Sequence, residues 1–191
     1  MSAPPKAPSR EIEMPAPYGF APAPGLRWEP GIDFAAMNIR ALISLWHARC
    51  PSRHGLPSYS QFDALELRPW ADHLIVLDLD ITLFGKRCFR YRSVGPAASA
   101  VEGGNFSGLY LGDALSPAQA DPRIVFYERA MRARAPVELH RPVEVVGQDG
   151  AGSPGAQRDA RWDSVALPLS EDHHHADHLM VLTYVEALGQ R

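Results

Sequence analysis

The chain has 191 residues, a net charge of −3 with neutral histidines and an isoelectric point near 6.2. This length allows one domain of ordinary size with a buried core. A slightly acidic chain has no overall attraction for nucleic acid or anionic lipid, so the charge argues against a dedicated nucleic-acid-binding protein. The cysteines Cys50 and Cys88 are too few for a disulfide framework and fit a reducing compartment.

The first 32 residues are rich in proline and alanine. Prolines remove backbone donors and disfavour helix at the preceding residue, so residues 1–32 are predicted to be a disordered tail. A docking peptide for a proline-binding module is the less favoured alternative. The tail has no apolar stretch of signal-peptide length, and the longest aliphatic run, residues 74–77, is too short to span a bilayer. We therefore expect a soluble, cytoplasmic protein.

A helix is predicted over residues 33–50. Asp33 offers an N-cap, and Pro51 stops the helix at its other end. The segment is apolar on more than one face, so packing on its own domain should leave part of it uncovered. We expect this part to bind a second chain, which gives a weak, micromolar homodimer or a surface for a signalling partner. The side chains predicted to form this interface are Phe34, Met37, Ile39, Leu42, Ile43 and Trp46.

Two neighbouring segments indicate an antiparallel hairpin. HLIVLDLDITLF alternates aliphatic and polar residues, and RCFRYRSVG alternates basic and aromatic residues. A turn at residues 84–86 would place Asp80 opposite Arg90 and Asp78 opposite Arg92 on one face of the hairpin, while aliphatic residues meet aromatic ones on the other. The arginines then have carboxylate partners, which favours a structural role over the binding of single-stranded nucleic acid.

The remaining segments complete a sheet. Short helices are predicted over residues 96–115, and a longer helix begins at Asp121 with Pro122 in its first turn and stops before Pro136. A flexible connection is expected at residues 147–159, between strands over 136–146, 161–169 and 178–188. This order predicts an α+β fold, with a five-stranded antiparallel sheet, helices on one face and an N-terminal helix.

The order of elements, with HLIVLDLD, FRYRSVG, NFSGLYL and LMVLTYV in their places, resembles the PAS domain. It is similar in particular to a bacterial single-domain PAS family, in which a leading helix with a tryptophan precedes a Leu-Pro segment. The resemblance covers residues 36–187, although SGLYL stands where the family has an arginine-containing turn. PAS domains are five-stranded sensory and dimerisation modules whose helices and sheet enclose a small-molecule pocket. The chain then divides into the tail 1–32, the helix 33–50 and a PAS-like domain at 51–188.

The resemblance implies a sensory or protein-interaction module without its own output domain, which acts in signal transduction through a partner protein. The alternative is a small-molecule sensor or carrier with an intrinsic ligand. Neither haem nor flavin is expected, because residues 95–135 contain no cysteine for covalent flavin chemistry and His140 is the single histidine of the neighbouring strand. The pocket is expected among the large apolar residues of the enclosing elements, which are Leu79, Ile81, Phe89, Tyr91, Phe106, Tyr110, Phe126 and Trp162.

The sequence contains no convincing catalytic or metal-binding set. No serine stands in a GxSxG setting, so no enzymatic activity is expected. His47, Cys50 and His54 have spacings that a metal could use, but Pro51 and the lack of a fourth ligand favour the end of a helix. The histidines of EDHHHADH, residues 171–178, are predicted to form a hairpin tip that captures metal adventitiously rather than a built site.

Overall fold

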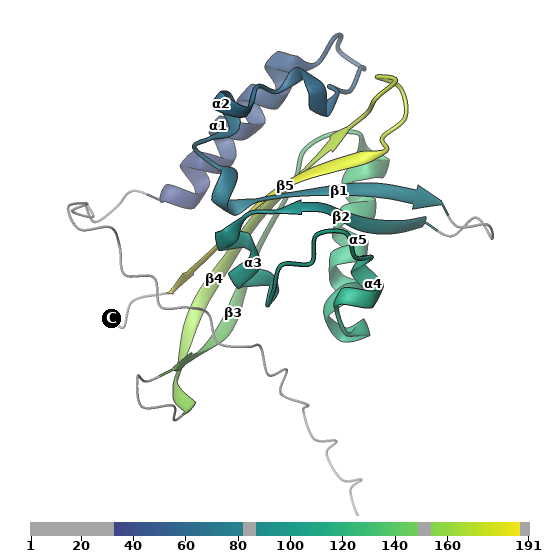
Figure 1. Cartoon of the computed structure of the whole chain (residues 1–191). Helices are drawn as coiled ribbons and strands as arrows, with labels where there is room; N and C mark the ends of the chain where they lie inside the picture. Colours follow the sequence, from purple (N-terminus) through teal and green to yellow (C-terminus); the bar gives the residue numbers. More distant parts are fainter. Residues whose placement is uncertain (1–32, 82–86, 149–153, 188–191) are drawn as a thin grey trace, which may run out of the picture.

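The computed structural model describes residues 33–81, 87–148 and 154–187 and shows an α+β fold built on a five-stranded antiparallel sheet (Figure 1). The strand order is β2-β1-β5-β4-β3, so the first and last strands of the chain lie side by side. The predicted fold class is therefore confirmed. The strands are β1 (Leu74–Ile81), β2 (Arg87–Val94), β3 (Val137–Gln148), β4 (Pro154–Leu169) and β5 (His178–Ala187).

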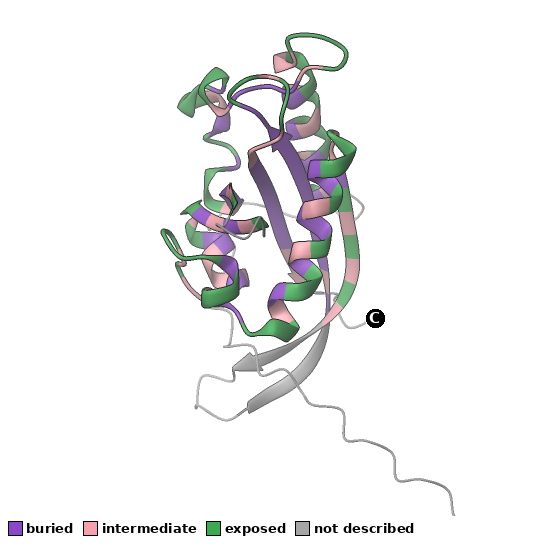
Figure 2. Ribbon diagram, turned by 90° about the vertical axis from the view of Figure 1, so that its right-hand side faces the viewer, coloured by how far each residue is buried: buried purple, intermediate pink, exposed green. Residues whose placement is uncertain are grey.

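Helices cover both faces of this sheet and form two separate cores, rather than the one face predicted, because the central strands are apolar on both sides. Helices α1 (Phe34–Arg49) and α2 (Ala64–Leu67) contribute to the core on one face, and α3 (Pro96–Glu102), α4 (Leu111–Ala114) and α5 (Pro117–Ala133) contribute to the other. Figure 2 shows the buried strands in purple behind flanking helices whose outer residues are exposed. Within the described ranges, no helix combines the length and apolarity that a bilayer-spanning segment needs.

The side chains of β5 alternate between these two cores. Leu179 and Val181 pack in the core under α5, whereas Met180 and Leu182 pack in the core under α1. Successive side chains of a strand point to opposite faces, so a strand that is covered on both sides needs apolar residues at consecutive positions. This requirement explains the continuous apolar run of β5.

Helix α1 forms where the sequence predicts it. The Asp33 side chain accepts a hydrogen bond from the Ala36 amide at 2.9 Å, which satisfies one of the unpaired donors at the helix start. Trp46 Nε1 donates to the carbonyl oxygen of Pro168 in β4 at 2.8 Å and so anchors the other end of the helix to the sheet. Ile43 is half-buried against the same core.

The predicted interface on α1 is wrong for three of its residues. Ile39, Leu42 and Trp46 are 0%, 0% and 3% exposed because they pack against β4 and β5. The chain's own sheet covers them, so they are not available to a second chain. Phe34 and Met37, 43% and 52% exposed, remain at the surface.

Strands β1 and β2 pair in a register two residues away from the predicted one. Asp78 lies opposite Arg90, and Asp80 lies opposite Cys88. Because the pleat repeats every two residues, this shift leaves every side chain on its predicted face. Asp78 accepts ion pairs from Arg90 at 3.0 Å and from Arg92 at 2.7 Å, so the arginines have carboxylate partners as predicted.

Helix α5 begins earlier than predicted. Gln119 Oε1 reaches back and accepts from the Ser116 amide at 3.2 Å and from the Ser116 hydroxyl at 2.8 Å, which closes the start of the helix at Ser116. Pro117 occupies the first turn, where its missing N–H costs nothing, and Pro122 lies inside the helix. The predicted start at Asp121 is therefore wrong, because a stronger start signal precedes it.

The hairpin of β3 and β4 is longer than predicted. Its pairing continues to Gln148 and Pro154, so most of the predicted connection at 147–159 belongs to the ladder. Backbone hydrogen bonds carry a ladder through polar residues, which the apolar alternation did not indicate. The predicted tail at 1–32 and the predicted turn at 84–86 lie outside the described residues.

Replacing Leu42 by alanine should lower the free energy of unfolding by about 2–5 kcal/mol, because the substitution leaves a cavity between α1 and the sheet. Met37→Ala, on the exposed side of the same helix, should change it by less than about 0.5 kcal/mol. Urea denaturation followed by circular dichroism measures both. Equally small effects would show that α1 is not packed on the sheet.

Candidate functional site

A group of charged and polar side chains lies between α5 and the sheet. It consists of Tyr91 of β2, Glu102 of α3, Arg123 of α5, Arg141 of β3 and Trp162 of β4, which we call the polar cluster. Glu102 and Arg123 are 4% and 8% exposed, although both residue types are rarely buried. The polar cluster thus joins two helices to three strands.

An ion pair forms the centre of the polar cluster. Arg123 Nε lies 3.0 Å from Glu102 Oε2, and the Tyr91 hydroxyl donates to the same oxygen at 3.1 Å. Arg123 Nη1 also donates to the carbonyl oxygen of Gln119 at 2.9 Å, which holds the guanidinium against its own helix. Because water is excluded from both partners, the loss of either would leave a buried charge.

Two guanidinium groups lie over the ring of Trp162. The centre of the Arg123 guanidinium is 4.7 Å from the ring centroid, and that of Arg141 is 4.3 Å away. Both distances fall within the range of cation–π attraction. Trp162 Nε1 donates to the Thr183 hydroxyl at 2.7 Å, so the ring is fixed in place beneath the cations.

One positive charge of the polar cluster has no carboxylate partner in the described part of the chain. Glu102 neutralises Arg123, whereas Arg141 Nε is shielded from solvent and makes no hydrogen bond. Burial, and then the charge of Arg123, lower the pKa of Arg141, against a smaller opposing effect of the Glu102 carboxylate. A buried polar group without a partner costs about 1–3 kcal/mol, so the Nε of Arg141 does not stabilise the fold through a hydrogen bond.

The polar cluster borders a small cavity of about 20 Å³. Phe126 and Tyr127 of α5 and Ser164 of β4 are among its other lining residues. This volume holds about one water-sized species, so a larger ligand enters only if α5 moves away from the sheet. Burial raises the pKa of the phenols of Tyr91 and Tyr127, which keeps both as neutral hydrogen-bonding groups.

Six of the predicted pocket residues lie in the core that contains this cavity or on its walls. Phe126 and Trp162 line the cavity itself. The others pack in the surrounding core without lining it, namely Leu79, Phe89, Tyr91 and Phe106. Contact of these residues with a ligand stays a prediction.

The other two predicted pocket residues are at the surface. Ile81 is 68% exposed because it ends β1 beyond the cover of the helices. Tyr110 is 39% exposed, and its hydroxyl donates to Asp80 at 3.0 Å. The prediction that they line the pocket is therefore wrong for this cavity.

Sequence reasoning missed the charged members of the polar cluster. It selected large apolar residues, although Glu102, Arg123 and Arg141 supply the charges that distinguish the cavity from ordinary core. One signal was available, because Arg123 shares a helix face with Tyr127 and Ala130, which are four and seven positions further on. A charge on a buried helix face indicates a partner in the interior.

Three carboxylates approach one another elsewhere, at the edge of α1. Oxygens of Asp33, Asp163 and Glu186 lie within 4.8 Å of one another, as metal ligands do. The guanidinium of Arg161 lies among them, 2.7 Å from Asp33 and 2.5 Å from Asp163. The positive charge that these carboxylates require is thus already supplied, and the group is an ion-pair network.

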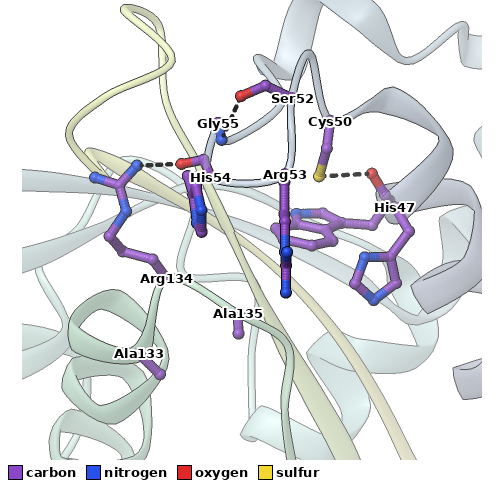
Figure 3. A pocket seen from close by; sticks show the side chains of 10 residues that line it. His47, Cys50, Ser52, Arg53, His54, Gly55, Ala133, Arg134 and Ala135 are labelled. Atoms are coloured by element: carbon purple, nitrogen blue, oxygen red, sulfur yellow. Dashed lines mark hydrogen bonds between the residues drawn. The ribbon is translucent and has the colours of Figure 1, made fainter.

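The residues His47, Cys50 and His54 line an open cleft at the C-terminal ends of α1 and α5 (Figure 3). Within the described ranges, their donor atoms do not form a group close enough to share an ion. Cys50 Sγ instead donates to the carbonyl oxygen of Trp46 at 3.4 Å. The structure therefore supports the predicted helix end.

The histidines of the segment 171–178 lie in the turn between β4 and β5 and at the first residue of β5. His175 Nδ1 is 2.9 Å from Asp172, and His178 Nδ1 is 2.5 Å from Asp177, so carboxylates already engage two of the rings. The predicted hairpin tip is confirmed. Adventitious capture of a metal by this turn stays a prediction.

Comparison with known proteins adds no family assignment. No family model matches the chain, and no curated protein matches it. A functional conclusion therefore has to rest on the fold and on the polar cluster.

Arg123→Gln should lower the free energy of unfolding by about 3–5 kcal/mol, because it leaves Glu102 as a buried charge without a partner. The matched control is Arg129→Gln on the exposed side of α5, for which we expect less than about 0.5 kcal/mol. Urea denaturation of the full chain measures both.

Adding Glu102→Gln to Arg123→Gln completes a double-mutant cycle. The double variant should lose less stability than the sum of the two single variants, with a coupling of about 0.5–3 kcal/mol. Strictly additive losses would contradict the direct pairing of these two side chains.

Proposed function

We propose that this chain is a PAS-like sensory module of the bacterial cytoplasm, which acts in signal transduction through a partner protein and has no catalytic activity of its own. The order of strands and helices supports the proposal, since α3, α4 and α5 follow β2 and cover one face of the antiparallel sheet. The observation that carries it is the buried, unbonded Nε of Arg141 in a cluster that joins this helical layer to the sheet.

A cluster in this position suits the detection of a signal. Arg123 contacts Glu102 of α3 and Trp162 of β4, so one guanidinium connects both layers of the fold. A change in the charge or occupancy of the cavity alters these contacts and shifts α5 and α3 relative to the sheet. Packed layers respond to such changes by discrete shifts, which a bound partner detects.

A second candidate function is a small-molecule sensor with an intrinsic anionic ligand. Two guanidinium groups, of Arg123 and Arg141, border the same cavity, and an oxyanion is the ligand that such groups bind best. This candidate is second because a cavity of about 20 Å³ is too small for a metabolite unless α5 first moves away from the sheet.

The exposed patch of Phe34 and Met37 on α1 is the surface we assign to the partner. Burying two such side chains gives at most about 3–6 kcal/mol, whereas association costs about 4–15 kcal/mol. Self-association through this patch is therefore weaker than the micromolar dimer expected from six side chains. A second copy that binds this weakly can be replaced on the same surface by a signalling protein.

Crosslinking and affinity isolation of the tagged full chain from its source cell should recover a kinase or another signalling regulator. Arg141→Met should change the recovered amount severalfold, because Arg141 belongs to the polar cluster, whereas Arg129→Met should recover the wild-type amount. Absence of any signalling protein, or equal recovery with both variants, would contradict the proposal. A small anion retained in native mass spectrometry and lost in Arg141→Met, without a protein partner, would favour the second candidate.

A further inference from the structure

An open cleft of about 660 Å³ lies where α1 and α5 end (Figure 3). Trp46, His47 and Cys50 contribute from α1, residues 52–55 from the following loop, and residues 133–135 from the end of α5. The volume falls within the roughly 300–1,000 Å³ of small-molecule sites. This cleft shares no residue with the cavity of the polar cluster.

The charged residues that line the cleft are cations. Arg53 and Arg134 line it, and none of the lining residues is acidic. The terminal nitrogens of Arg134 donate to the carbonyl oxygens of His54 and His174, and these neutral acceptors leave its charge in place. Arg53 makes no ion pair or hydrogen bond in the described part of the chain, and Figure 3 shows it reaching into the cleft between His54 and His47.

The helix ends around the cleft oppose this charge only in part. The C-terminal end of a helix carries about half a negative charge, so α1 and α5 together contribute about one. The guanidinium groups of Arg53 and Arg134 contribute two positive charges. The net charge around the cleft is therefore positive, which favours an anionic ligand.

Two residues with positive φ values form hydrogen bonds to the backbone of the loop that carries Arg53. Arg134 and His173 have φ values of 52° and 64°, and in the described part of the chain no other non-glycine residue has a positive φ. This conformation costs about 1–2 kcal/mol for an ordinary side chain. His173 accepts a backbone hydrogen bond from Leu56 at 3.1 Å, and Arg134 bonds His54, so both fix the loop.

The cleft combines its cationic side with an apolar surface. Ala133 and Ala135 supply this surface together with the exposed ring of His47, which rests edge to face on the buried Trp46 at 4.9 Å. Imidazole rings add hydrogen-bonding atoms beside the guanidinium groups. A ligand that matches both parts has a flat apolar body and an anionic group.

We propose that this cleft binds a small organic anion, with a flat ring on the apolar surface and one phosphate or carboxylate group. The oxyanion lies against the guanidinium of Arg53, with Arg134 behind it, and receives charge-assisted hydrogen bonds. The ring packs beside His47 and Ala135. This site is independent of the polar cluster and of the proposed sensory function.

Isothermal titration of the full chain with phenyl phosphate tests the site. We expect submillimolar binding, with benzyl alcohol and inorganic phosphate each at least about tenfold weaker, because each lacks one half of the ligand. Arg53→Gln should weaken phenyl phosphate at least about tenfold and leave the fold intact, since Arg53 has no partner in the described residues. Arg40→Gln removes the same charge from the exposed face of α1 and should leave binding unchanged.

Several results would overturn the assignment. The absence of binding by both phenyl phosphate and benzoate would remove the site. Equal losses of affinity in Arg53→Gln and Arg40→Gln would show that binding depends on the overall charge of the chain rather than on this cleft. If benzyl alcohol bound as tightly as phenyl phosphate, the anionic group would not contribute to binding. If a glutamate-rich peptide bound and phenyl phosphate did not, the ligand would be a peptide rather than a small molecule. None of these results bears on Arg141, so the proposed function is tested separately.

Discussion

The central strands of the sheet are apolar on both faces, and both faces therefore need a cover. β5 places Leu179 and Val181 toward α5 and Met180 and Leu182 toward α1, with all four side chains buried. This constraint fixes α1 on one face and the layer of α3, α4 and α5 on the other. It also encloses Glu102, which faces the interior at the end of α3 and has to find its partner there.

Local patterns determined most of the fold and could be predicted from the sequence. The Asp33 cap, the alternation of β1 and β2 and the apolar run of β5 each depend on neighbours in the chain. The register of the β1–β2 hairpin could not be predicted in the same way, because a two-residue shift preserves every face and only the turn distinguishes the alternatives. The face of the sheet that α1 covers is a tertiary property, which periodicity does not contain.

The candidate site was predicted only in its apolar part. Phe126 and Trp162 were identified because large aromatic residues suit a cavity wall, and both line it. Arg123 and Arg141 come from segments 18 residues apart in the sequence and meet only over Trp162 of a third element. Because the two arginines belong to different elements, the sequence does not show that they lie close together in the fold.

The central claim is that Arg141, with its buried and unbonded Nε, is retained in the polar cluster for function rather than for stability. The free energy of unfolding of Arg141→Met tests it most directly, because methionine retains packing against Trp162 and removes both the desolvated charge and its repulsion by Arg123. We predict that the urea midpoint of the variant rises while the denaturant dependence stays unchanged. A loss of more than about 1 kcal/mol would show that Arg141 stabilises the fold through its cation–π contact, and would contradict the claim.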